Sequence, residues 1–145
     1  MSTESNKNHI RRWFDALNRG TALDVIDETY AADYVLYDPS LPEPVRGVEG
    51  IRQFMTAVVT AFPDAHYTVE DLIAEGDKVV QRCSVRGTHQ GEFLGIPPTG
   101  KQVAIPFMIV SRFAGDKIAE EWQMLDALGM LTQLGVIPSP EQAGA

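Results

Sequence analysis

In the first half of the chain, apolar side chains recur every three or four residues, which is the spacing of one face of a helix. This pattern predicts helices over residues 5–17, 21–30 and 51–62. Gly20 follows the first of them, where a left-handed helix cap would lie. A brief extended stretch over residues 33–38 separates the second helix from the third.

The second half changes to the alternating pattern that is typical of β-strands. Strands are predicted over residues 66–74, 78–89, 102–113 and 118–126. A Gly-Asp turn joins the first pair of strands and another joins the last pair, which indicates two tight hairpins. Helices followed by an antiparallel meander predict an α+β fold, and the length favours one domain over residues 1–145 whose tail, about 138–145, could be flexible.

Alternation along the strands indicates which side chains face the interior. His89 continues an apolar row that includes Cys83. In the last strand Trp122, Met124 and Asp126 share one row, so the aspartate would stand at the end of an apolar face. Burying a carboxylate without a partner is costly, so a carboxylate at this position requires an explanation.

The strand over residues 102–113 is apolar on both faces. This predicts that helices cover one face and favours a second subunit on the other. Pro106 lies inside this strand and removes a backbone donor, which predicts either a bulge or an unpaired side at that point.

Charge and cysteine content remove several classes of function. Twelve Lys and Arg against twenty Asp and Glu leave a net charge of −8, which argues against nucleic-acid binding. One cysteine cannot form an internal disulfide, and neither a zinc-ligand spacing nor a glycine-rich phosphate loop is present, so we expect no metal and no cofactor. No apolar run approaches the roughly 18 residues of a membrane span, and the first residues lack a signal peptide. The expectation is a cytoplasmic protein that binds no membrane.

Three ionisable residues are candidates for chemistry if the strands curl around the helices and form an apolar cavity. Desolvation would raise the pKa of Asp126 and suit it to remove a proton next to a carbonyl group. Each candidate also has a structural interpretation. Asp126 precedes a short helical pattern and could be its N-cap, Asp38 could bond its own backbone before Pro39, and His89 could be a hydrogen-bonded structural histidine.

Several motifs together resemble the SnoaL-like polyketide cyclase (ester cyclase) family. They are HQGEFLGIPPTGK over residues 89–101, the W-x-x-x-D pattern of Trp122 and Asp126, and QLG over residues 133–135. The resemblance covers nearly the whole chain. It implies the cone of the nuclear-transport-factor-2-like superfamily, in which a curved antiparallel or mixed sheet wraps around N-terminal helices and encloses a pocket. It also implies a cofactor-free intramolecular aldol condensation with an aspartate, here Asp126, as general base.

A more distant resemblance is to the ketosteroid isomerases. The segment AADYVLYDP over residues 31–39 is similar to the one that carries their proton-shuttling base, and Asp38 occupies that place. Those enzymes hold the substrate oxyanion with a tyrosine and a protonated aspartate, whereas this chain has Trp13 and, approximately, Ile109 there. The chain also departs from many cyclases in having Tyr37 where they have histidine.

We therefore expect an enzyme that acts on an apolar, carbonyl-bearing small molecule and assembles as a homodimer or homotetramer. Asp126 would be the base, His89 would polarise the substrate oxygen, and Asp38 would be a second acid or base. The predicted pocket walls are Trp122, Tyr37, Tyr34, Trp13, Phe107 and Met124. The alternatives are a non-catalytic binding or interaction module on the same fold, and a relative of the isomerases or epoxide hydrolases.

Overall fold

The computed structural model describes residues 2–138 and has an α+β fold. Its helical segments are α1 (Thr3–Arg19), the 3₁₀ turn η1 (Ala22–Asp24), α2 (Ile26–Thr29), α3 (Gly47–Ala61) and α4 (Ala127–Gln133). Its strands are β1 (Tyr30–Tyr37), β2 (Val45–Arg46), β3 (His66–Glu75), β4 (Lys78–Thr88), β5 (Gln102–Ala114) and β6 (Lys117–Leu125). The tail predicted over 138–145 falls outside the described residues except for Pro138.

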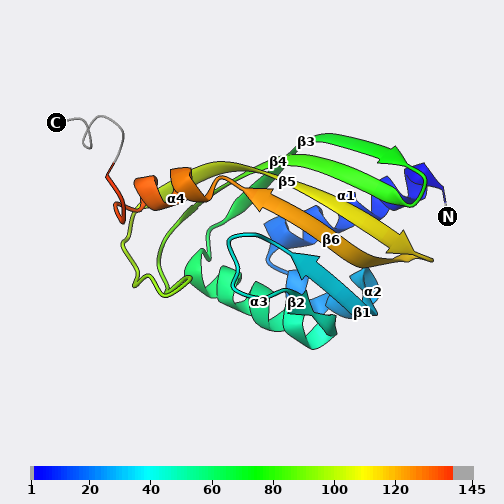
Figure 1. The fold of residues 1–145 in the computed structure, drawn as a ribbon, viewed down its shortest axis with the longest axis horizontal. Coiled ribbons are helices and arrows are strands. Elements are labelled where there is room, and N and C mark those ends of the chain that lie inside the picture. Colours follow the sequence, from blue (N-terminus) through cyan, green and yellow to red (C-terminus); the bar gives the residue numbers. More distant parts are fainter. Residues whose placement is uncertain (1, 139–145) are drawn as a thin grey trace.

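The six strands form one curved mixed sheet in the order β2-β1-β6-β5-β4-β3. β1 runs parallel to β6, and all other neighbours are antiparallel. The long strands arch over α1 and α3, with α4 and the β4–β5 loop at one end of the arch and the hairpin turns at the other (Figure 1). Within residues 2–138, none of the helices has the length and apolar character that a membrane crossing demands.

The first predicted helix is confirmed, and its ends explain why it forms there. Ser2 and Ser5 make a capping box in which each side chain bonds the other's backbone, and Gly20 ends the helix with a φ of 77°. The second predicted helix, over residues 21–30, is wrong in its extent. It divides into η1 and the single turn of α2, because β1 begins at Tyr30 and pairs with β6.

A β-bulge in β6 determines which of its side chains point into the interior of the protein. Arg112 of β5 pairs with Glu120, but the next residue of β5, Phe113, pairs with Ile118, so Ala119 is an extra residue. A one-residue insertion turns every later side chain to the opposite face. Glu121, Gln123 and Leu125 therefore face inwards.

The prediction that Trp122 and Met124 face the interior is consequently wrong. Their side chains are 37% and 65% exposed on the outer face of the sheet. Tyr37 lies beside them, with its ring stacked on that of Trp122 at a centroid distance of 6.1 Å.

Pro106 lies in β5 without a bulge, and its carbonyl oxygen accepts the N–H of Asp126 at 3.3 Å. The β4–β5 register runs through it without a shift, from Lys78–Arg112 to Thr88–Gln102. The β5–β6 pairing ends at Phe107–Leu125, so the proline lies just past the last paired residue of β6. The missing N–H therefore costs no ladder hydrogen bond.

Two apolar clusters fill the space under the arch. The larger one joins α1 and α3 to the middle of the sheet and includes an aromatic series in which Trp13 contacts Tyr30 edge-on and Tyr30 contacts Tyr34. The smaller cluster lies under α4 and contains Val103, Ile105, Met130 and Leu134. The space between these clusters and the β4–β5 loop contains the candidate site.

Candidate functional site

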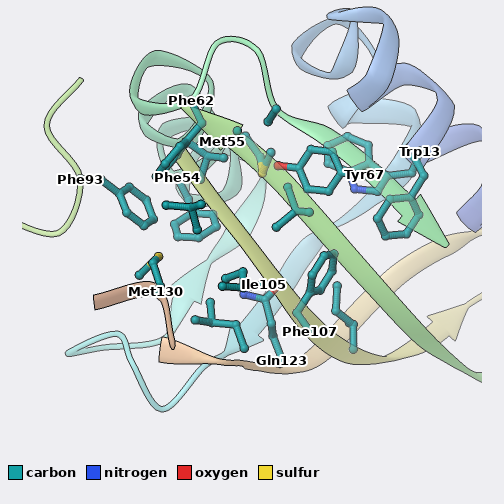
Figure 2. A pocket seen from close by; sticks show the side chains of 18 residues that line it. Trp13, Phe54, Met55, Phe62, Tyr67, Phe93, Ile105, Phe107, Gln123 and Met130 are labelled. Carbon is teal, nitrogen blue, oxygen red and sulfur yellow. The ribbon is translucent and has the colours of Figure 1, made fainter. Parts of the chain in front are cut away.

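A cavity of about 140 Å³ lies between α1, α3 and the concave face of the sheet. Figure 2 shows its wall side chains converging from these elements, with Phe93 and Met130 at one end. Its apolar wall residues are Phe14, Phe54, Met55, Val58, Phe62, Ala65, Val85, Gly87, Phe93, Val103, Ile105, Phe107, Ile109, Leu125 and Met130. The remaining wall residues are Trp13, Tyr67 and Gln123, so none of the described residues in the wall is charged.

The three polar wall residues supply neutral hydrogen-bonding groups. Burial raises the pKa of Tyr67 to about 12, so its hydroxyl stays protonated at neutral pH and remains a donor. Trp13 carries an indole N–H, which can only donate, and Gln123 carries an amide, which both donates and accepts. The cavity can therefore orient an apolar ligand through its carbonyl or hydroxyl oxygens.

The loop between β4 and β5 forms one rim of the cavity. Phe93 and Ile96 pair through two backbone hydrogen bonds, and the ring of Phe93 packs edge-on against Phe62 at 5.5 Å. The loop is held down where the N–H of Gly91 donates to the carbonyl oxygen of Ala61. A Cβ at Gly91 would lie 2.7 Å from the backbone oxygen of Thr60, so only glycine permits this close approach.

His89 lies at the base of that loop and is fully buried. Its Nδ1 accepts the backbone N–H of Thr99 at 3.2 Å and lies 3.0 Å from the Thr99 hydroxyl oxygen. Its ring stacks on Phe62, and its Nε2 has no hydrogen-bond partner among residues 2–138. His89 is not among the wall residues of the cavity, so these contacts favour the structural interpretation of this residue.

Asp38 forms the turn that its place before Pro39 predicts, and it also reaches the cavity wall. Its Oδ1 accepts the backbone N–H of Ser40 at 2.8 Å and the Ser40 hydroxyl at 2.6 Å. Its Oδ2 accepts Nε2 of Gln123 at 2.8 Å. Asp38 as a whole residue is only 8% exposed, and its carboxylate lies behind Gln123, whose amide it fixes in place.

Asp126 follows β6 directly and is the N-cap of α4. Its Oδ1 accepts the N–H of Gly129 at 2.9 Å, whereas its Oδ2 accepts no hydrogen bond from the described residues. The expectation that Asp126 is desolvated at the end of a buried apolar row is wrong, because the residue is exposed. Of its neighbours in sequence, Leu125 before it and Met130 on α4 line the cavity. The capping interpretation is thereby confirmed, and one carboxylate oxygen remains free for other contacts.

The structure does not bring the three candidate ionisable residues together on the cavity wall. Of the predicted wall residues, Trp13 and Phe107 line the cavity, and their contact with a substrate remains a prediction. Tyr34 is buried in the core, while the remaining three lie on the outer face of the sheet as described above.

A buried polar network around Glu121 was not predicted. Oε1 of Glu121 accepts the hydroxyl of Tyr34 at 2.6 Å, and Oε2 accepts that of Ser111, which in turn accepts Nε2 of Gln81 at 2.6 Å. Burial raises the pKa of Glu121, although the hydrogen bonds from Ser111 and Tyr34 lower it in part. Gln81 and Ser111 both interrupt otherwise apolar strand rows, and these interruptions were the available signal in the sequence.

Metal binding has no evident site in the part of the chain from residue 2 to residue 138. No group of three or more His, Cys, Asp or Glu side chains is placed there to share an ion. Burial raises the pKa of the single cysteine, Cys83, to about 12, which disfavours the thiolate that a metal or an electrophile would require.

The sequence model of the SnoaL-like polyketide cyclase family matches residues 8–134. The chain belongs to this family. The SnoaL-like chain is 29% identical over 147 residues to aklanonic acid methyl ester cyclase DnrD of Streptomyces peucetius, with 97% of each sequence covered. Its curved sheet and helices form the nuclear-transport-factor-2-like cone that the resemblance implied.

Solved structures of two relatives show the same fold. IdmH, a putative polyketide cyclase from Streptomyces antibioticus, has a TM-score of 0.76 and 34% identity, covering 90% of this chain and 98% of that one. AclR, a putative hydroxylase from Streptomyces galilaeus, has a TM-score of 0.82 and 31% identity, covering 94% of this chain and 100% of that one. The relatives support a cyclase-type enzyme at the family level, while the individual reaction depends on the site.

Proposed function

We propose that this SnoaL-like protein binds an uncharged, apolar, carbonyl-bearing compound in the cavity and closes a carbon–carbon ring in it. The observation that carries the proposal is a wall of apolar side chains interrupted by three neutral polar groups and by no charge among the described residues. A free carboxylate buried there would lack a cation to compensate its desolvation. A carboxylic acid substrate should therefore enter as its ester, as the description of DnrD as a methyl ester cyclase suggests by analogy.

The proposed reaction is an intramolecular aldol addition with Asp126 as general base. A carboxylate oxygen removes a proton from the carbon next to one carbonyl group, and the resulting enolate carbon bonds to a second carbonyl carbon of the same molecule. The alkoxide then takes the proton back, so that substrate and product have the same composition and no redox cofactor is needed. The free Oδ2 of Asp126 and its position between two wall residues support this role.

The size of the cavity has a consequence for substrate entry. A cavity of about 150 Å³ holds a ligand the size of benzene, and this one has about 140 Å³. A polycyclic substrate exceeds this volume, and at the rim Phe93 belongs to the β4–β5 loop and Met130 to the short helix α4. We propose that the β4–β5 loop moves outwards when such a substrate binds.

The ester preference tests the proposed function directly. Purified protein is incubated, with a chelator and without added cofactors, with aryl diketones that carry a methyl ester and with the matching free acids. We expect a cyclised product of unchanged mass. The kcat/KM for the ester should be at least about tenfold higher than that for the matching free acid, because the acid must lose its hydration to enter the cavity. Mass spectrometry with chromatographic separation measures both. Binding of the esters without conversion would support the non-catalytic module instead, and equal conversion of the acids would contradict the neutral-ligand argument.

We also infer that the outer face of the sheet joins copies of this chain. Trp122, Met124, Met108 and Tyr37 are exposed there on neighbouring strands, whereas an outer face in contact with water normally carries polar residues. We expect the protein to sediment at twice the chain mass or more, and Met108→Lys to shift it towards the single chain. Leu128→Lys, at a more exposed apolar position on α4 (69% against 47% for Met108), is the control, and a wild-type monomer would refute the inference.

A further inference from the structure

Gln123 differs from the other polar residues of the cavity wall because a buried carboxylate holds it from behind. Its side chain extends from β6 towards Ile105 among the wall residues (Figure 2). Nε2 of Gln123 donates to Oδ2 of Asp38 at 2.8 Å. The hydroxyl and backbone N–H of Ser40 hold the other oxygen of that carboxylate. Both oxygens of Asp38 are thus engaged, and the hydrogen bond to Oδ2 holds the amide of Gln123 in place.

The contact with Asp38 also determines which way the amide faces. An ionised carboxylate only accepts hydrogen bonds, so it must meet the nitrogen of Gln123 and not the oxygen. This leaves the second N–H and the Oε1 of Gln123, neither of which makes a hydrogen bond with the residues that the structure describes. Gln123 is half-buried, so its unused donor can meet water while the cavity is empty. A ligand that fills the cavity excludes this water, and it must then bring an acceptor of its own, because a donor left unpaired in an apolar surrounding is costly.

We infer that the free N–H of Gln123 donates to a carbonyl oxygen of the bound substrate, and that Asp38 is a positioning residue that acts through Gln123. The identity of the substrate carbonyl rests on the function proposed above, but binding of a simple ketone tests the inference without turnover. In the reaction this contact would hold the carbonyl in place and stabilise negative charge on its oxygen when the enolate or alkoxide forms. Asp38 would then affect binding without touching the ligand.

Acetophenone and ethylbenzene form a matched pair of probes for this contact. They have nearly the same shape and fit a cavity for a single ring, but only acetophenone has a carbonyl oxygen. Binding is followed by the fluorescence of Trp13 in a Trp122→Phe background, which removes the outer-face tryptophan and leaves the one in the wall. The infrared stretch of ¹³C-labelled acetophenone reports the hydrogen bond to its carbonyl.

Gln123→Leu keeps an apolar side chain in the wall and removes the amide. We expect it to weaken acetophenone binding by about tenfold, which is the size expected for one buried hydrogen bond, and to leave ethylbenzene binding unchanged or stronger. The carbonyl stretch should be lower in the wild-type complex than in the variant. Equal effects on both ligands, an unchanged stretch, or failure of the wild-type protein to bind either probe would overturn the inference.

Asp38→Asn tests the positioning role. Asparagine can still form the turn with Ser40, but it can present either an oxygen or an amino group to Gln123, so the amide is no longer held in one orientation. We expect about a threefold loss of acetophenone affinity in the wild-type background and no loss in the Gln123→Leu background. An equal loss in both backgrounds would show that Asp38 only supports the fold. If both probes behave as expected but the diketone esters are not converted, the proposed function fails and this inference stands.

Discussion

Replacement of Asp126 by asparagine is expected to lower kcat for ring closure by about 10²–10⁴-fold, which is the usual contribution of a positioned general base. Asparagine has nearly the same shape and is an equally good N-cap, so the hydrogen bond to Gly129 and the helix α4 should persist. The effect would therefore report the loss of the base and not a loss of structure. Single-turnover measurement of product formation, with circular dichroism to verify the fold, provides the comparison.

The control for Asp126 is Asp116→Asn in the turn between β5 and β6. This substitution removes one surface carboxylate and changes the net charge equally, so it should leave turnover unchanged. If Asp126→Asn retains wild-type turnover while the wild-type protein is active, Asp126 serves only as a cap. Asp126→Ala separates the two roles further, because it should also destabilise the fold by about 0.5–2 kcal/mol through loss of the cap.

Replacement of Glu121 by alanine is expected to lower the free energy of unfolding by roughly 3–5 kcal/mol. The substitution leaves the hydroxyls of Tyr34 and Ser111 without their acceptor inside the core and opens a void beside them. Glu121→Gln is the matched variant, because it keeps almost the same volume and its amide oxygen still accepts from Tyr34, so that only the hydroxyl of Ser111 loses its acceptor. It should lose about 1–3 kcal/mol at neutral pH, which is less than the loss in the alanine variant. Urea unfolding followed by fluorescence measures both variants.

The pKa of Glu121 also predicts the pH dependence of stability. In the unfolded chain this carboxyl has its ordinary value near 4.5, and in the folded protein burial raises its pKa. At a pH between these two pKa values, the folded protein binds a proton at Glu121 that the unfolded chain has lost. The contribution of Glu121 to the free energy of unfolding is therefore complete below its ordinary pKa and is lost as the pH rises through the raised pKa of the folded protein. The urea midpoint of the wild type should therefore decrease with rising pH relative to that of Glu121→Gln. Parallel pH profiles of the two proteins would contradict this assignment.

Most of the secondary structure could be predicted because it depends on local patterns. Helix α1 begins and ends within two residues of its prediction, and β3, β4, β5 and β6 differ from theirs by at most one residue at each end. Hydrophobic periodicity and turn glycines act over a few residues, so they can be read without knowing the rest of the fold. Two segments differ more: α3 begins at Gly47, four residues before its predicted start, and the helix predicted over residues 21–30 is shortened by strand β1. Its partner β6 lies some 85 residues further along the chain, and no local pattern reports that pairing.

The candidate site was predictable only in part for the same reason. The motif around Asp126 and the turn at Asp38 are local, and both residues lie next to the cavity wall. Gln123 and Glu121 were not predicted as interior residues because the extra residue Ala119 exchanges the inner and outer faces of the last strand. The same exchange places Trp122 and Met124 on the outer face. Tyr67 was missed because its role depends on which elements enclose it.

By itself the sequence determined the α+β class, the family and the positions of most helices and strands, since these follow from periodicity, turn chemistry and motif. Only the tertiary structure decided which side chains line the cavity and which carboxylates are engaged. The interior of a sheet depends on register, and register is set by pairing between distant strands and by the bulge at Ala119. This register turns both Gln123 and Glu121 of β6 inwards, where Gln123 donates to Asp38 and Glu121 accepts the hydroxyl of Tyr34.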